Sequence, residues 1–448
     1  MNHIISKMIM YGDMPKDTIL IELAELFKEF DRIEEDYKSG NITTEQFNTG
    51  KDIVRTGIYK QIKRILVVAT DYGFDTNLWH NYLTFVIITN ENPFSLTCEK
   101  TGANNGSVNH FAKNDFKAFK ELFDYDFSHI EKELGINCFS LLSDYKAIGK
   151  KEFMYNINVS EKVQALSLKL GKAADEEEFF TYVTDFYRDY GVGMFGLNKA
   201  FRITSQNEYQ VNFCPINNMD KVMLDDLIGY EIQKKKLVDN TKAFVEGKKA
   251  NNVLLFGDSG TGKSTSIKAI VNEFYDQGLR MIEIYKHQFK DLSNVIASIK
   301  NRNYKFIIYM DDLSFEEFEI EYKFLKAVIE GGVETKPENI LIYATSNRRH
   351  LVKETWKDRD DVEKGQGLHR SDTMEEKLSL VNRFGVTINY SKPSQKEYFN
   401  IVTELAKKAG IDMSESELCA EANKWELSHG GISGRTAQQF INYISALQ

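Results

Sequence analysis

The sequence predicts an α/β fold, with a parallel sheet flanked by helices, that is preceded by a mainly α-helical N-terminal domain. Two observations support this prediction. Apolar residues recur at helical spacing over most of residues 17–189, whereas the second half contains short apolar runs separated by segments long enough for helices. The chain has 448 residues, 42% of them apolar and 27% charged, which is ordinary for two or three globular domains. We therefore expect a helical domain over residues 1–198 and an α/β half after it.

Polar residues mark where helices of the N-terminal domain are expected to begin. Thr43 and Gln46 have the spacing of a capping box, and Asp75-Thr76 precedes an apolar run over residues 78–88. The acidic run at residues 175–178 suits a helix N-terminus, where negative charge is favoured. No motif in this domain indicates a catalytic chemistry, so we expect it to recognise a partner.

The spacing of apolar residues changes to two within residues 199–216. Phe201 and Ile203 alternate with polar residues before a polar turn, and Tyr209, Val211 and Phe213 do so after it, which predicts a β-hairpin. The hairpin is either a joint between the two halves of the chain or the edge of a subdomain, and the pattern fits both equally.

A phosphate-binding loop is predicted at residues 251–265, which read NNVLLFGDSGTGKST. A buried strand precedes the glycines and an amphipathic helix follows them, which is the context that the pattern G-x-x-x-x-G-K-[ST] requires. The glycines let successive N–H groups point into one concavity, and the helix presents its positive end there. Lys263 is expected to reach the β- and γ-phosphates, and the Ser264 hydroxyl to bind Mg²⁺. The nucleotide-binding residues predicted here are Gly257, Asp258, Ser259, Gly260, Thr261, Gly262, Lys263, Ser264 and Thr265.

An acidic pair follows a second apolar strand, predicted at residues 306–310. Such a strand can deliver two carboxylates beside the phosphate-binding loop. Asp311 is then expected to hold Mg²⁺, directly or through water, and Asp312 to polarise the attacking water. A third buried strand, at residues 340–345, ends shortly before Asn347, whose amide could orient that water.

At this point the chain resembles the AAA+ ATPases over roughly residues 220–448. The run LDDLIGYE, with Ile228 and Gly229, looks like the adenine-side segment of that family, Asp311-Asp312 like its Walker B pair and Asn347 like its sensor 1. Within AAA+, the motifs are similar to a bacterial domain-of-unknown-function family of P-loop ATP-binding proteins. The resemblance implies an AAA+ P-loop NTPase core over residues 217–392 and a small helical lid over residues 393–448.

Two arginines resemble catalytic arginines of the same family. Arg383 lies just before a strand predicted at residues 386–390 and resembles the finger that projects into a neighbour's site. Arg435 opens the last helix and resembles sensor 2, which reaches the γ-phosphate from the lid. Other arginines compete for the role of the finger, namely Arg348, Arg349, Arg359 and Arg370.

Two departures from the AAA+ pattern affect the expected activity. Asp312 stands where Glu is usual and is one methylene shorter, which bears on the speed of hydrolysis. Residues 286–290 lack the aromatic-apolar-glycine pore loop of protein unfoldases, so threading of a polypeptide is not the favoured activity.

Three functions are compatible with these motifs. The favoured one is an ATPase with ATP and Mg²⁺ as ligands, acting as a homo-oligomer that remodels or switches a macromolecular client bound by the N-terminal half. The second is a slowly hydrolysing, ATP-dependent scaffold, which the shorter Asp312 motivates. The third is a P-loop kinase, against which the lid arginine Arg435 counts.

The composition of the chain limits which other partners and ligands are expected. A net charge of −9 does not favour a generally basic surface, so nucleic acid is a possible but unsupported partner, and the basic residues of 51–64 fit a solvated helix face better than an anion site. The four cysteines are far apart and indicate neither disulfides nor a zinc site. No apolar run is long enough to span a bilayer and the N-terminus does not resemble a signal peptide, which predicts a cytoplasmic protein without a membrane partner.

Overall fold

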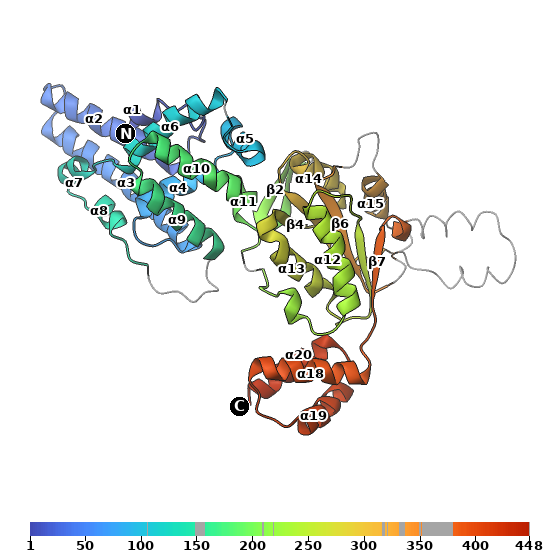
Figure 1. The fold of residues 1–448 in the computed structure, drawn as a ribbon. Coiled ribbons are helices and arrows are strands. Elements are labelled where there is room, and N and C mark those ends of the chain that lie inside the picture. Colours follow the sequence, from blue (N-terminus) through green and yellow to red (C-terminus); the bar gives the residue numbers. More distant parts are fainter. Residues whose placement is uncertain are drawn as a thin grey trace. The chain divides into compact units, whose positions relative to one another are not determined.

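The structure is a computed structural model, and it describes residues 1–104, 106–147, 157–207, 210–217, 219–315, 319, 321–330, 337–348, 351 and 380–447. The chain forms two compact units, Met1–Asn198 and Lys199–Gln448. Figure 1 shows helices in the first unit and a sheet with flanking helices in the second. This confirms the predicted fold class.

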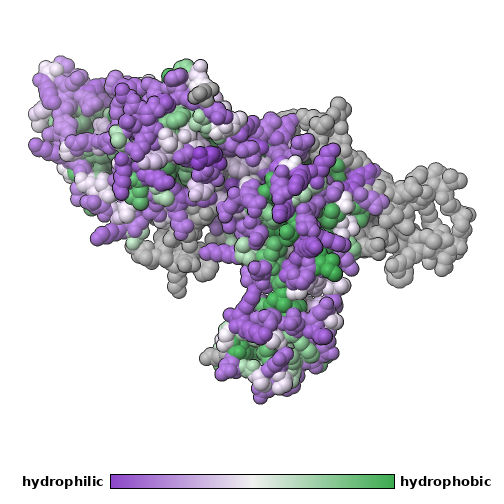
Figure 2. Space-filling model, viewed as in Figure 1, coloured by the Kyte–Doolittle hydropathy of each residue, from purple (hydrophilic) through white to green (hydrophobic). Residues whose placement is uncertain are grey.

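The described part of the first unit is built from helices. In chain order they are α1 (Asn2–Ile5), α2 (Ile19–Lys38), α3 (Thr44–Tyr72), α4 (Leu78–Thr89), α5 (Pro93–Thr101), α6 (Val108–Phe123), α7 (Ser128–Leu134), α8 (Cys138–Ser143), α9 (Ile157–Lys172), α10 (Glu176–Tyr190) and α11 (Gly193–Leu197). Their apolar faces share one core, rich in aromatic residues. The face of this unit seen in Figure 2 is mostly hydrophilic, as expected where the apolar side chains are used internally.

All three predicted helix starts are confirmed, although in one of them a different residue forms the cap. Thr43 and Gln46 form the capping box of α3, and Asp175 caps α10. Helix α4, however, is capped by Asn77, whose Oδ1 accepts from the backbone N–H of His80 at 2.9 Å. Asp75 is used elsewhere, since its carboxylate accepts from the N–H of Thr76 and from that of Ala147.

Buried carboxylates tie the helices of the first unit together. Asp115 is fully buried and accepts from the backbone N–H groups of Ile9, Met10 and Tyr11 at 2.7–3.0 Å. Glu131 likewise accepts from the first N–H groups of α8. These carboxylates are satisfied by backbone that would otherwise lack partners.

The second unit contains a seven-stranded sheet within its described residues. The strands are β1 (Ala200–Asn207), β2 (Gln210–Pro215), β3 (Val253–Gly257), β4 (Leu279–Glu283), β5 (Lys305–Met310), β6 (Ile340–Ser346) and β7 (Val386–Tyr390), in the order β2-β1-β4-β5-β6-β3-β7. All neighbours are parallel except the antiparallel pair β1 and β2. The predicted hairpin is therefore present, and because β1 pairs with β4 it forms an edge of this sheet.

Helices flank the sheet and build the lid. They are α12 (Glu231–Val245), α13 (Lys263–Phe274), α14 (Leu292–Ile299) and α15 (Glu321–Glu330), with 3₁₀ turns η1 (Leu224–Asp226), η2 (Tyr275–Gln277) and η3 (Lys286–Asp291), followed by α18 (Gln395–Ala409), α19 (Glu415–Ser428) and α20 (Gly434–Ser445). Alternate residues of the central strands pack beneath α12 and α13, and the last three helices share a small core of their own. The predicted inward residues of α13 are all buried, namely Ile267, Ile270, Val271 and Phe274.

The strand order decides where the site lies. Strands β5, β6 and β3 are consecutive in the sheet and parallel, so their carboxyl ends meet at one edge. The phosphate-binding loop follows β3, the acidic pair follows β5 and Asn347 follows β6. Open parallel sheets bind ligands at this edge. Among the described helices, none is both long and apolar enough to cross a membrane.

Candidate nucleotide site

The loop between β3 and α13 has the backbone that close approach of an anion requires. Gly257 has φ 131°, and a Cβ there would lie 2.2 Å from the carbonyl oxygen of Tyr390. Gly262 has φ 90° and caps α13, so the positive end of that helix opens into the loop. Gly257 is therefore needed both for its backbone conformation and for the close approach of β7, and Gly262 for its backbone conformation.

Lys263 is directed back across this loop. Its side chain is buried, and Nζ donates to the carbonyl oxygens of Gly257 at 2.9 Å and Asp258 at 2.6 Å and to Oδ1 of Asn347 at 3.0 Å. Burial lowers the pKa of Lys263, although the nearby carboxylates of Asp258 and the acidic pair oppose that shift. A cation held among weak carbonyl acceptors is well placed to bind phosphate oxygens instead.

Asp311 is surrounded by hydroxyl groups. Its Oδ1 accepts from Ser264 at 2.7 Å, Tyr309 at 2.7 Å and Thr345 at 2.5 Å. Burial acts to raise the pKa of Asp311, but these hydrogen bonds outweigh it and lower the pKa. The carboxylate is therefore ionised near neutral pH and fixed in orientation.

Asp312 is held from two sides in a strained conformation. It has φ 50°, a left-handed value that is uncommon for a residue other than glycine. Its backbone N–H donates to Oγ1 of Thr345 at 2.9 Å, and its Oδ1 accepts from Nδ2 of Asn347 at 2.8 Å. Asn347 thus connects Lys263 to Asp312 through the two ends of one amide, with its oxygen toward the cation.

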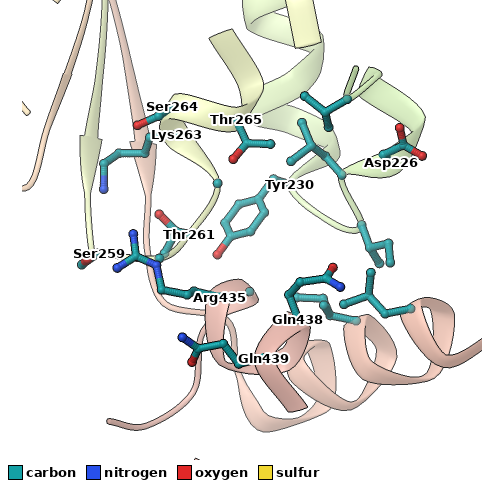
Figure 3. A pocket seen from close by; sticks show the side chains of 18 of the residues that line it. Asp226, Tyr230, Ser259, Thr261, Lys263, Ser264, Thr265, Arg435, Gln438 and Gln439 are labelled. Atoms are coloured by element: carbon teal, nitrogen blue, oxygen red, sulfur yellow. The ribbon is translucent and has the colours of Figure 1, made fainter. Parts of the chain in front are cut away.

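The lid closes these residues into a cavity of about 980 Å³. The backbone N–H of Arg435 donates to the carbonyl oxygen of Gly260 at 3.1 Å, which brings the first turn of α20 against the phosphate-binding loop. Figure 3 shows the Arg435 side chain beside Ser259 and Thr261, with Lys263 and Ser264 further along the loop. On the other side the lining is partly apolar, with Ile228 from the core and Ile401 and Ile441 from the lid.

Most of the site residues predicted from the sequence line this cavity. They are Ile228, Ser259, Gly260, Thr261, Gly262, Lys263, Ser264, Thr265, Asp311, Asp312, Asn347 and Arg435. Gly229, Gly257 and Asp258 do not line it, although Asp258 accepts from the N–H of Lys392 at 2.8 Å and so connects the loop to the start of the lid.

Arg383 lies apart from the cavity. It precedes β7, whose amino end is level with the amino end of β3. Arg383 therefore lies at the amino ends of these strands, whereas the phosphate-binding loop follows the carboxyl end of β3. Of the competing arginines, Arg348 follows Asn347, while Arg349, Arg359 and Arg370 lie outside the described residues.

Several residues of the site were not predicted, and four of them stand out by their contacts. Tyr309 and Thr345 hold Asp311, Lys408 of the lid donates to Asp226 at 3.1 Å, and Tyr230 lines the cavity.

Tyr230 has φ 58°, stacks on Tyr390 and donates to the carbonyl oxygen of Ser391 at 2.9 Å. The signal for Tyr230 was its place directly after Ile228 and Gly229, since a residue next to a predicted base contact is itself near the base.

The oxygen atoms beside the acidic pair are suitable ligands for Mg²⁺. This ion prefers hard oxygen ligands and is commonly bound by one or two carboxylates together with substrate phosphates. The hydroxyl oxygen of Ser264 and the carboxylate of Asp311 are 2.7 Å apart and face the same cavity. Ser264 and Asp311 are therefore the residues that would hold the ion.

Comparison with known proteins places the chain in a family. Residues 197–448 match the family model described as "Protein of unknown function (DUF815)". A search of curated proteins gave no match. Among solved structures, a mutant of RuvB from Thermotoga maritima has a TM-score of 0.34 and 17% identity over 49% of this chain and 64% of its own. Another T. maritima RuvB, described as a Holliday junction branch migration motor, has a TM-score of 0.31 and 16% identity over 50% of this chain and 72% of its own.

The chain spans about 64% of the length of the first of these structures. The family match is independent of them and covers more than half of the chain. With the phosphate-binding loop, the acidic pair and the lid all inside the matched residues, the chain belongs to the DUF815 family.

Proposed function

We propose that this protein binds ATP with Mg²⁺ between core and lid, hydrolyses it, and uses the cycle to switch or remodel a macromolecular partner. The observation that carries this proposal is the chain of contacts from Lys263 through Asn347 to Asp312. It joins a phosphate-binding cation to a carboxylate suited to polarising water, beside a fitting metal site. A structural ion pair would bring the two charges into direct contact rather than leave both facing a cavity.

Each residue then has a definite task in hydrolysis. The oxygen of a water attacks the γ-phosphorus, the bond to the ADP oxygen breaks, and Asp312 takes up the proton that the attacking water loses. Lys263 and Arg435 supply positive charge to the phosphoryl oxygens, and Asn347 fixes the orientation of Asp312. Mg²⁺ would neutralise charge on the β- and γ-phosphates when bound to Ser264 and Asp311.

The phosphate-binding assignment is tested with Lys263→Ala. This variant should lose most of its affinity for ATP or most of its turnover, measured by calorimetry and by phosphate release. Lys268→Ala is the matched control, because Lys268 lies on the same helix and pairs with Asp220 outside the cavity. Binding and hydrolysis by Lys263→Ala at the level of this control would overturn the site assignment.

Assembly into a homo-oligomer is part of the proposal. Arg383 is at the edge of the sheet opposite to its own phosphate-binding loop, so it could reach such a loop only in a second copy. An arginine suits that task because its planar guanidinium can contact two phosphoryl oxygens at once.

Partner selection is assigned to the helical unit, because its buried polar groups serve its own fold and no catalytic cluster lies among its described residues. A fragment that begins at Lys199 keeps the β1–β2 hairpin in the sheet and should retain nucleotide binding. It should lose any partner that the full chain captures. If the fragment captures the same partner equally well, selection belongs to the second unit.

A slowly hydrolysing scaffold is the second candidate function. The side chain of Asp312 is short and already bound to Asn347, which favours a water that is held less closely than by a glutamate. A turnover measurement separates the two candidates, since a scaffold would bind ATP tightly and release phosphate over many minutes.

A further inference from the structure

Two buried hydroxyl groups meet at the carboxylate of Asp311. Tyr309 in β5 is 1% exposed and Thr345 in β6 is 2% exposed, yet both side chains direct their hydroxyls to Oδ1 of Asp311, at 2.7 and 2.5 Å. The register between the strands explains this meeting, because Met310 pairs with Ala344 and so brings Asp311 level with Thr345.

Thr345 also holds the second acid. Its Oγ1 accepts from the backbone N–H of Asp312 at 2.9 Å while it donates to Asp311. A single hydroxyl therefore connects the carboxylate of the expected metal ligand to the left-handed backbone of the residue that faces the water. Tyr309 contacts only the first of these acids.

Ser264 completes the arrangement. It donates its own proton to the same oxygen of Asp311, which leaves its lone pairs directed away from the carboxylate. A hydroxyl that donates to a fixed carboxylate can offer its oxygen to a cation, whereas a rotating one presents its proton part of the time. The orientation of Ser264 thus depends on how firmly Asp311 is held.

We propose that Tyr309 and Thr345 are positioning residues for Mg²⁺, which hold Asp311 in place for the ion, and that Thr345 in addition positions Asp312 for hydrolysis. This inference rests on the proposed ATP site. It assigns different effects to the two residues, because one of them serves the metal alone and the other serves both the metal and the water.

The two substitutions should separate affinity from rate. Loss of a group that orients a metal ligand typically costs about 10- to 100-fold in metal affinity. Tyr309→Phe should therefore raise the Mg²⁺ concentration needed for half-maximal binding of a non-hydrolysable ATP analogue by about tenfold or more, with kcat near wild type at saturating Mg²⁺. Thr345→Val should lose both Mg²⁺ affinity and kcat, and Thr345→Ser should restore both.

Tyr343→Phe is the matched control. Tyr343 lies opposite Tyr309 in the sheet and is equally buried, but its hydroxyl contacts Thr241 at 2.8 Å and Asn240 at 3.1 Å. Both substitutions remove one buried phenol oxygen, so a general effect on packing should appear in both. Binding of the analogue is measured by calorimetry across a Mg²⁺ series and in EDTA, and thermal unfolding is measured without nucleotide.

The outcomes distinguish this inference from the function on which it rests. If the wild type shows no Mg²⁺-dependent binding, the proposed function is wrong. If the wild type depends on Mg²⁺ but Tyr309→Phe shifts that dependence no more than Tyr343→Phe does, the positioning role is overturned. Should Tyr309→Phe fail to fold, Thr345→Val against Thr345→Ser decides the question, and equal Mg²⁺ dependence and kcat in those two would also overturn it.

Discussion

Carboxylates are used in two different ways in the two units of this chain. In the first unit, Asp115 is fully buried and accepts from three consecutive backbone N–H groups. In the second, Asp311 accepts from three side-chain hydroxyls and faces a cavity. Backbone N–H groups cannot turn away without unfolding, whereas hydroxyls can rotate toward a ligand. The first arrangement therefore stabilises a fold, and the second is suited to binding.

The largest expected effect concerns whether the cavity of one chain holds all the positive charge that hydrolysis needs. If it lacks a positive charge supplied by another copy, Arg383→Ala should bind ATP nearly normally and hydrolyse it about 10³- to 10⁵-fold more slowly. Wild-type activity per subunit should then rise with protein concentration in a phosphate-release assay.

Complementation makes the Arg383 prediction decisive. Arg383→Ala and Lys263→Ala should each be inactive alone, but their mixture contains some interfaces with an intact loop and an intact arginine. Recovered activity supports an assembly. An inactive mixture, together with wild-type activity that is independent of concentration down to monomeric protein, would show that one chain is sufficient.

The next largest effect concerns Asp312, the acid that we propose polarises the attacking water. Asp312→Asn should keep ATP binding, because the side chain contacts Asn347 and not the phosphate-binding loop. Hydrolysis should fall by about 10²- to 10⁴-fold, as expected for loss of a general base. Single-turnover phosphate release measures this, and a rate equal to wild type would assign the base to another group.

The contrast between the two kinds of carboxylate is tested directly by stability. Asp115→Ala removes the buried acceptor of the backbone N–H groups of Ile9, Met10 and Tyr11 and should cost about 3 kcal/mol in the free energy of unfolding of the first unit. Asp311→Ala should cost less, about 1–2 kcal/mol without ligand, because Ser264 and Thr345 line the cavity and can turn to water there, so that only the buried Tyr309 hydroxyl loses its acceptor.

Chemical denaturation measures both costs, and hydrogen exchange at the amides of residues 9–11 reports the local effect of Asp115→Ala. Glu131→Ala is a useful companion to Asp115→Ala, since Glu131 accepts from the N–H groups of Phe139 and Ser140 and should show a similar loss of stability. Equal costs for Asp115→Ala and Asp311→Ala would remove the distinction between the two arrangements.

The features that could be predicted from the sequence are those with a local signal. The strands that carry the site, the phosphate-binding loop and the acidic pair were predicted because their signals are local: apolar runs, glycines at fixed spacing and polar residues at strand ends. Tyr309 and Thr345 were not predicted, because a tyrosine or threonine inside an apolar strand looks like a core residue. Their role depends on the register of β5 against β6, which no local pattern encodes.

Two further features of the fold were also beyond local reasoning. The hairpin was predicted, but its parallel pairing with β4 joins residues about eighty positions apart and has no local signal. Helix α4 begins at Leu78 as predicted, but its cap is Asn77, while the carboxylate of Asp75 accepts from the N–H of Ala147, far along the chain. Both features involve a contact between residues that are far apart in the chain.

The smallest expected effect concerns how the lid closes the open side of the cavity. Lys408 of α18 donates to the carbonyl oxygen of Asp225 at 3.0 Å and to Oδ1 of Asp226 at 3.1 Å, joining the lid to the segment before α12. Both side chains of this ion pair are about half exposed, and such pairs contribute only about 0.2–1 kcal/mol. Lys408→Ala should therefore speed nucleotide release by no more than about fivefold, measured by displacement of a fluorescent nucleotide.

The adjacent lysine provides the control for this last prediction. Lys407→Ala removes the same charge from the same turn, but Lys407 pairs with Glu404 on its own helix. Only the Lys408 variant should release nucleotide faster, and the difference should shrink as salt screens the wild-type contact. If both variants release nucleotide at the same rate, the ion pair does not hold the lid. Closure would then depend on the contact between Arg435 and Gly260 and on the contact between Lys392 and Asp258, both of which involve the phosphate-binding loop itself.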